Sequence, residues 1–359
     1  MTNASSPAAS VKRKRNDPNL ETITLDPHYD LVVIVGTPAH PDGQKAFRVN
    51  KGSMRHVSDI WMKMLTGDWA ESKQSEIEFP DDSWWPFDIV LRIAHLQVAG
   101  LPELVLFEDL QELAKLTDKY NLTKAVRMGL DLKQWLHRHK SSWEAWPSSP
   151  KTRHFAFMTS VFQYSADLAF LTSKLAVEVR VDKKELFRYH GAAKTSLASS
   201  LPDALLANIN KIRNDILWEL IGCCKLAITN ATRAEKKPPC KTAQCAALKV
   251  GILVTDLSTA GLYPTPGDAK ELHGNVLSYW RAVNRIGAAH ATYRPCDKLQ
   301  TPNPYAYTLT PHGTKAQCNY AKCFGDFGIK DAVKNVLQQR VHADVFAHVQ
   351  THAFMNATY

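Results

Sequence analysis

The sequence lacks long apolar runs, and its composition is otherwise ordinary. Of its 359 residues, 45% are hydrophobic and 22% are charged, which is the balance of a typical globular chain. The longest unbroken apolar run, Leu31–Val35, is far shorter than the roughly 20 residues that cross a bilayer. We therefore expect no membrane-spanning segment and no membrane partner.

The first 222 residues contain no cysteine, and the N-terminal charges are not followed by an apolar stretch. All seven cysteines lie after residue 222. The N-terminal pattern is not that of a secretory signal, so we expect the protein in the nucleus and/or cytoplasm. In those compartments cysteines are reduced thiols or metal ligands rather than a disulfide framework.

Motifs for common enzymes are also missing. The sequence contains neither Gly-rich phosphate-binding pattern and no G-x-S-x-G elbow. His348 and His352 are spaced as in a zinc protease, but no Glu lies between them. The sequence therefore predicts a protein that is not an enzyme.

Acidic residues are scarce in the last two thirds of the chain. The net charge of +9 comes from 44 basic and 35 acidic residues, and residues 139–359 carry 27 and 16 of these, a local net of +11. Such a region attracts nucleic acid or an acidic partner through long-range fields. The simpler interpretation is a solvated, lysine-rich surface, because no basic–aromatic array accompanies the charge.

Residues 1–27 have too little apolar content to form a core, and we interpret them as a disordered basic tail. Within this tail, four consecutive residues are basic: Lys12, Arg13, Lys14 and Arg15. Such a cluster is a candidate for nuclear import. The alternative is a tail that only aids solubility.

Residues 28–138 read as one compact α/β domain. Strands are expected at 31–35, 45–49 and 76–80, because apolar residues there are continuous or alternate with polar ones. Apolar residues at helical spacing from Met54 to Leu65 predict a helix or a broken pair, with Ser58 as a cap for the second part. Asp81, Asp82 and Ser83 are candidate caps of the next helix, and two more helices follow.

Three motifs in this region occur in a recognisable order. They are Phe47, Asn50 and Lys51; then Met54, Ser58 and Trp61; then Leu113, Ala114, Lys119, Tyr120 and Leu122. With the strand and helix order, they resemble a BTB/POZ domain over about 110 of the 359 residues. Asn50 stands where the family usually has His, and residues 93–97 depart from the family's common ending in a way similar to BTB domains of filamentous fungi.

The resemblance implies the fold class and the organisation of the chain. We expect an α/β chain: a BTB/POZ fold, with a small mixed sheet and a helical cluster, followed by a mainly α-helical C-terminal region. The rest divides into a helical extension at 139–239 and a mainly helical region at 240–359 with scattered Cys and His.

Two pairs of residues in the BTB-like region are candidate interaction sites by this resemblance. Trp69 and Glu71 match a hydrophobic-x-Glu motif through which some BTB domains dock a cullin scaffold; alternatively, Trp69 closes the core and Glu71 caps a turn. Asp30 and Lys51 match a charged pair at the centre of BTB dimers; alternatively, Asp30 caps the strand entry and Lys51 is solvated.

Cysteine and histidine spacing raises one cofactor hypothesis. Cys240, Cys245, His290 and Cys296 could supply the four thiolate and imidazole ligands of a structural zinc site. C-x4-C is a weak signature, however, and isolated thiols are often small buried apolar groups. No other cofactor is predicted.

The sequence thus predicts a protein–protein interaction module that self-associates as a homodimer through its BTB-like domain. In its most concrete form it is an adaptor that brings an unknown client, read by residues 139–359, to a cullin-type ubiquitin ligase. The alternative is a nuclear, nucleic-acid-associated regulator that uses the dimer and the basic C-terminal region.

Overall fold

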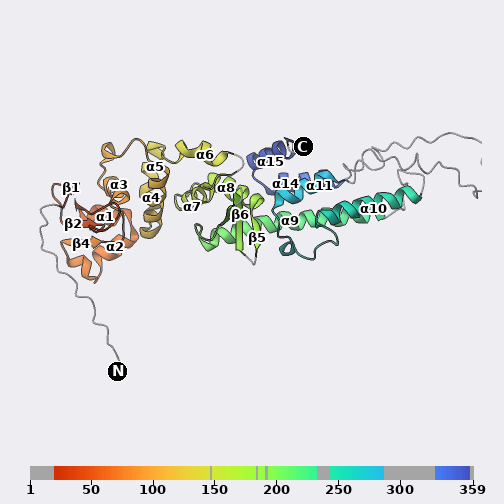
Figure 1. Ribbon diagram of the computed structural model, residues 1–359. Helices are drawn as coiled ribbons and strands as arrows, with labels where there is room; N and C mark the ends of the chain where they lie inside the picture. Colours follow the sequence, from red (N-terminus) through yellow and green to blue (C-terminus); the bar gives the residue numbers. More distant parts are fainter. Residues whose placement is uncertain are drawn as a thin grey trace, which may run out of the picture. The chain divides into compact units, whose positions relative to one another are not determined.

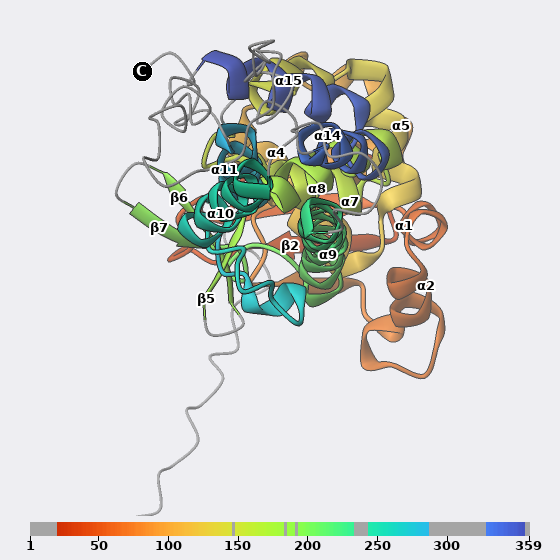
Figure 2. The ribbon, with the colours of Figure 1, turned by 90° about the vertical axis from the view of Figure 1, so that its right-hand side faces the viewer.

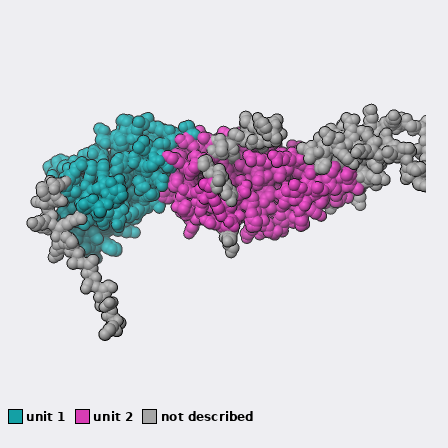
Figure 3. Space-filling view, in the orientation of Figure 1, with its two compact units in different colours: residues 1–141, 158–163 teal, residues 142–157, 164–359 magenta. Residues whose placement is uncertain are grey.

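The structure is a computed structural model, and it describes residues 20–145, 148–182, 185–190, 193–232, 243–286 and 328–355. The chain divides into two compact units (Figure 3): residues 1–141 with 158–163, and residues 142–157 with 164–359. The expected mixed α/β class, with a small mixed sheet and many helices, is confirmed. The second unit contains residues from both of the regions predicted to follow residue 138.

A four-stranded mixed sheet lies at the core of the first unit (Figure 1). Its strands, in spatial order, are β1 (Thr22–Thr24), β3 (Lys45–Val49), β2 (Leu31–Val35) and β4 (Glu76–Phe79). The central β2 pairs antiparallel with β3 and parallel with β4, so that Val33 lies opposite both Phe47 and Ile77. Leu31, Val33 and Val35 of β2 are fully buried. The three strands expected from the apolar pattern are confirmed as β2, β3 and β4.

Strand β1 corrects the prediction that residues 1–27 are a disordered tail. Thr22–Thr24 pairs parallel with β3, and Thr22 lies opposite Ala46. The strand has three residues, none of them buried, so it carries no periodic apolar signal. Residues 1–19 lie outside the described residues.

Helices surround this sheet where the sequence predicted them. They are α1 (Lys51–Val57), α2 (Asp59–Thr66), α3 (Trp84–Ala94), α4 (Phe107–Tyr120) and α5 (Thr123–Lys133), with short 3-10 turns η1 (Ala70–Lys73), η2 (Val98–Gly100) and η3 (His137–His139). The expected break at Ser58 is confirmed, because its hydroxyl accepts the Trp61 N–H at 3.1 Å and caps α2. The same hydroxyl donates to the Tyr120 carbonyl at 2.6 Å.

Asp82 does not cap α3, contrary to the sequence prediction. Its carboxylate accepts hydrogen bonds from the Tyr120 hydroxyl and the Lys119 ammonium, both at 2.7 Å. Ser83 occupies the N-cap position of α3, but its side chain makes no capping hydrogen bond and donates to Asp42 instead. Burial, and then the Asp82 carboxylate, raise the pKa of Tyr120 above its usual value. The carboxylate therefore ties α4 to the loop before α3.

The second unit is built mainly from helices. They are α6 (Lys140–Glu144) and α7 (Thr152–Val161), which both cross the boundary between the units, and α8 (Ser165–Glu178), α9 (Asp203–Thr232), α10 (Ala243–Thr259), α11 (Val276–Arg285), α14 (Ile329–Arg340) and α15 (Ala343–Met355), with the 3-10 turn η4 (Ala269–Glu271). The 30-residue α9 lies against α8, α10 and α14 (Figure 2). None of the helices in the described ranges is long and apolar enough to span a bilayer.

The region 139–239, predicted as a helical extension, also contains a small antiparallel sheet. Its strands are β5 (Arg180–Asp182), β6 (Glu185–His190) and β7 (Ala193–Ser196), in that order. The strands are three to six residues long, and Leu186 and Phe187 are the buried apolar residues assigned to them. Such short, mostly polar strands give no clear alternation in the sequence.

Two cationic side chains are fully buried in the second unit. The Lys174 ammonium of α8 donates to the carbonyls of Trp143 and Ala145 at 2.7 and 2.5 Å. The Arg213 guanidinium of α9 donates to the carbonyls of Leu272 and Gly274. Burial lowers the pKa of Lys174 to about 8 and that of Arg213 to about 10. Lys174 thus links α8 to the C-terminal end of α6, and Arg213 links α9 to the segment after η4.

Lys174 makes stability depend on pH in a predictable direction. Its pKa is about 8 in the folded chain and 10.5 by default, so between these values the unfolded chain holds more protons. The free energy of unfolding should therefore rise with pH across this window. We expect Lys174→Met to remove a gain on the order of 1 to 2 kcal/mol between pH 7.5 and 9.5, measured by urea unfolding.

The matched control is Lys211→Met, which removes a lysine from an exposed position on α9. This variant should keep the pH dependence of the unmodified chain. Equal slopes for Lys174→Met and the unmodified chain would show that Lys174 does not titrate in this window.

Candidate protein-interaction site

Trp69 lies on the surface of the first unit, between α2 and β4. Its side chain is 65% exposed, whereas Trp61 of the neighbouring α2 is fully buried. A tryptophan usually hides most of its large apolar surface. The alternative in which Trp69 closes the domain core therefore does not describe this structure.

The backbone around Trp69 is held by short local contacts. Trp69 is the N-cap residue of η1, and its carbonyl accepts the Ser72 hydroxyl at 2.8 Å and the Ser72 N–H at 3.1 Å. Gly67 ends α2 beside the indole: a Cβ on Gly67 would meet Trp69 Cδ1 and the Lys63 carbonyl, both at 3.1 Å. Glycine therefore lets the ring lie close to the backbone at this turn.

Glu71 lies two residues after Trp69, in η1, and is partly exposed. Its carbonyl accepts the Gln74 N–H at 3.2 Å. Within the described part of the chain, its carboxylate accepts no hydrogen bond and forms no ion pair, so the capping role considered from the sequence is not seen. An exposed aromatic ring and a carboxylate with no partner in that part of the chain thus occur two residues apart on one short turn.

Lys51 holds this turn in place. It is the first residue of α1, and its ammonium donates to the carbonyls of Ser72 at 3.1 Å and Gln74 at 2.7 Å. A charged donor strengthens both hydrogen bonds. Lys51 is therefore not a freely solvated side chain, because it links α1 to the segment that carries Trp69 and Glu71.

Asp30 contacts Lys51 through the backbone rather than through a side-chain ion pair. The Asp30 carboxylate accepts the Lys51 N–H at 2.7 Å, at the N-terminus of α1 where a negative charge is favourable. The two residues are thus in contact within one chain, but not through their charges. The Asp30 carboxylate accepts the Lys51 backbone N–H, whereas the Lys51 ammonium binds the Ser72 and Gln74 carbonyls.

Asn50 and His95 complete the support of α1. Asn50 is the N-cap of α1, and its side-chain oxygen accepts the N–H groups of Gly52 and Ser53. Its own N–H donates to His95 Nε2 at 2.9 Å, while His95 Nδ1 lies 2.8 Å from the Leu91 carbonyl. A neutral His95 with its proton on Nδ1 satisfies both contacts. This contact ties the start of α1 to the end of α3.

The other predicted site residues cannot be placed in the same way. The basic cluster Lys12, Arg13, Lys14 and Arg15 lies outside the described residues, as do Cys240, His290 and Cys296. Cys245 lies in α10, and the structure gives only its backbone. Among the residues that could be searched, no three His, Cys, Asp or Glu side chains gather around a common point. The zinc hypothesis therefore stays a prediction.

Sequence reasoning missed the two buried cations of the second unit. Lys174 lies in the wholly buried stretch 170–178 of α8, and Arg213 lies on the apolar face of α9. A charged residue inside an otherwise apolar stretch was the available signal. The carbonyl groups that bind these cations come from the end of α6 and from the segment after η4, about 30 and 60 residues away, which no local pattern reveals.

Comparison with known proteins adds no relative. No family model, curated protein or solved structure matches the chain.

The Lys51 contact predicts a local effect on the Trp69 turn. Lys51→Met keeps the length of the side chain but removes both hydrogen bonds to the turn. We expect hydrogen exchange of residues 69–75 to accelerate about thirtyfold, because two charge-assisted contacts of roughly 1 kcal/mol each are lost. Exchange mass spectrometry at neutral pH would measure this rate.

The control is Lys63→Met, which removes an exposed lysine of α2. This variant should leave exchange in residues 69–75 unchanged. Unaltered exchange in Lys51→Met would mean that the ammonium does not hold the turn.

Proposed function

We propose that the chain is a protein–protein interaction module of the BTB/POZ type that docks a cullin scaffold through Trp69 and Glu71. One observation carries the proposal: Trp69 is 65% exposed, on the turn that also carries Glu71. The second unit would then recruit a client protein for ubiquitin transfer.

The arrangement of the first unit supports this proposal. Its strand and helix order, with β3 leading into α1 and α2 and returning to β4, is the order that resembled a BTB/POZ domain in the sequence. Asn50, which stands where the family usually has His, donates its backbone N–H to His95 at the end of α3 at 2.9 Å, and its side chain caps α1.

The chemistry of the turn suits docking to another protein. A tryptophan buries a large apolar area when it enters a pocket, and aromatic residues carry much of the energy in protein interfaces. A nearby carboxylate sets orientation and disfavours wrong partners. Because Lys51 and Ser72 already hold the turn, little conformational entropy is lost on binding.

Self-association is the second part of the proposal. The family resemblance places the dimer contact near β2 and the start of α1, where Asp30 is exposed. Because the Lys51 ammonium already binds the Ser72 and Gln74 carbonyls, the proposal assigns the interchain charge interaction to Asp30.

The docking proposal predicts binding of the full chain to the N-terminal repeats of a cullin. We expect a dissociation constant on the order of 1 µM or tighter by calorimetry. Trp69→Ala should weaken binding by at least about tenfold, because an anchoring aromatic is lost. Glu71→Ala should weaken it by several-fold, through loss of the charge interaction.

Trp218→Ala is the matched control, because Trp218 is 52% exposed on α9 of the second unit. It should bind as tightly as the unmodified chain. An absence of binding by folded protein, or equal losses in Trp69→Ala and Trp218→Ala, would reject docking at this turn.

The self-association proposal predicts a dimer at micromolar concentration in analytical ultracentrifugation. Asp30→Asn keeps an oxygen that can accept the Lys51 N–H but removes the charge, so we expect dimerisation to weaken by roughly three- to tenfold. Asp118→Asn, at an exposed position of α4, should have no effect. A monomer at every concentration would contradict the proposal.

A further inference from the structure

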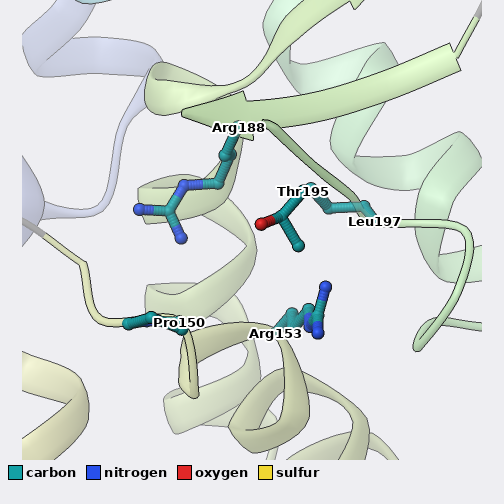
Figure 4. A pocket seen from close by; sticks show the side chains of 5 residues that line it. All are labelled: Pro150, Arg153, Arg188, Thr195 and Leu197. Carbon is teal, nitrogen blue, oxygen red and sulfur yellow. The ribbon is translucent and has the colours of Figure 1, made fainter. Parts of the chain in front are cut away.

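The second unit contains a hollow lined by two arginines that no role proposed above uses (Figure 4). Its walls are Pro150, Arg153, Arg188, Thr195 and Leu197. Arg153 comes from the first turn of α7, Arg188 from β6 and Thr195 from β7. The space, measured out to its open mouth, is about 300 Å³, which is small for a drug-sized ligand.

Arg188 is held in place on one side of the hollow. Its Nη2 lies 2.6 Å from a Glu178 carboxylate oxygen and donates to the Ser148 carbonyl at 3.0 Å. The side chains of Arg188 and Glu178 are only 13% and 8% exposed. Both contacts use the same nitrogen, and within the described part of the chain Nη1 and Nε have no hydrogen-bond partner.

Glu178 is itself engaged from several sides. Its carboxylate accepts the Ser148 N–H at 3.3 Å and the Ser148 hydroxyl at 3.0 Å. It also acts on the charge of the buried Lys174, as does Arg188. Glu178 therefore lies close to two buried or nearly buried cations, Arg188 and Lys174, and the Glu144 carboxylate also acts on the charge of Lys174.

Arg153 adds a further positive charge at the hollow. Its guanidinium donates to the Ser196 carbonyl at 3.1 Å and to His154 Nε2 at 3.3 Å. Neither partner is an acid, and Arg153 has no carboxylate partner among the residues that the structure describes. The guanidinium is therefore positioned by neutral groups, and its charge is left for a ligand.

The side chains of Arg153, Arg188 and Thr195 supply hydrogen-bond donors that suit an oxyanion. Two guanidinium groups offer planar, multiple N–H donors, and such groups bind phosphate and carboxylate oxygens in pairs. In Figure 4 the Thr195 hydroxyl points into the space between the two arginines. Because Arg153 lies in the first turn of α7, the helix dipole adds to the positive potential.

We propose that Arg153, Arg188 and Thr195 form a binding site for a single phosphoryl group. A phosphoryl group has three acceptor oxygens and about two negative charges, which suits donors from three directions and a local excess of positive charge. A carboxylate has only two oxygens and one charge. The ligand is either free phosphate or a phosphorylated side chain, since both present the same group.

Calorimetry of the full chain with inorganic phosphate tests this site at fixed ionic strength and pH 7.4. We expect saturable binding with a dissociation constant on the order of 1 mM or tighter. Arg153→Met should weaken binding at least about tenfold, and Thr195→Val, which removes only the hydroxyl, about threefold. Arg188 is left intact, because its loss would leave Glu178 buried without its cation.

Lys194→Met is the matched control, since Lys194 lies on β7 and pairs with Asp182 at 2.8 Å. It removes one positive charge from the same sheet but should not change phosphate binding. Equal weakening by Lys194→Met and Arg153→Met would overturn the proposal, as would no saturable binding by a chain whose thermal unfolding is normal.

A second titration identifies the source of the phosphoryl group. O-phospho-L-serine within a short neutral peptide is compared with inorganic phosphate and with the same peptide unphosphorylated. Tighter binding of the phosphopeptide supports the site and assigns it to a partner's side chain, whereas equal binding supports the site and assigns it to free phosphate. Equal binding of the unphosphorylated peptide would contradict recognition of the phosphoryl group.

Discussion

A cationic side chain bound to main-chain carbonyl oxygens is the interaction on which the loops of both units depend. Lys51 binds the carbonyls of Ser72 and Gln74. Lys174 and Arg213 each bind two carbonyls in the second unit. In all three cases the two carbonyl groups are two residues apart. For the buried Lys174 and Arg213 the electrostatic attraction is strong, because their sites are poorly solvated.

The sheet of the first unit sets where the Lys51 contact is made. Parallel strands cannot be joined by a tight turn, so the chain must cross from β2 to β4 through β3, α1 and α2. The parallel pairing then fixes the return of the chain, because the Val32 N–H donates to the Ser75 carbonyl at 2.9 Å. The turn with Trp69 and Glu71 lies just before this point. The connection that the sheet requires therefore places this turn between α2 and β4.

Local patterns predicted the elements that carry a strong apolar signal. Strands β2, β3 and β4 and the break at Ser58 follow from alternation, helical spacing and capping chemistry. The short strands β1 and β5–β7 carry no such signal, since their pairing depends on residues far away in the sequence. Asp82 shows the same limit: it looks like a helix cap locally, yet it binds Tyr120 and Lys119, 38 and 37 residues away.

The candidate sites show how far residue type alone can lead. A match to the hydrophobic-x-Glu motif identified Trp69 and Glu71 as a candidate docking site, but the exposure of their side chains is a property of the folded turn. The family resemblance identified Asp30 and Lys51 as a candidate charged pair. In the structure, the ammonium of Lys51 binds the Ser72 and Gln74 carbonyls, which no motif predicts. Arg153, Arg188 and Thr195 come from a helix and two strands, so only the fold brings them together.

Footprinting of Trp69 by hydroxyl radicals tests the central claim most directly. The claim is that this exposed ring is the contact made with a cullin scaffold. The oxidation rates of Trp69 and Trp218 would be compared in the full chain, with and without a saturating amount of the cullin's N-terminal repeats. The account predicts that Trp69 becomes several-fold less reactive while Trp218 is unchanged. Equal oxidation of Trp69 in the free and mixed samples would contradict it.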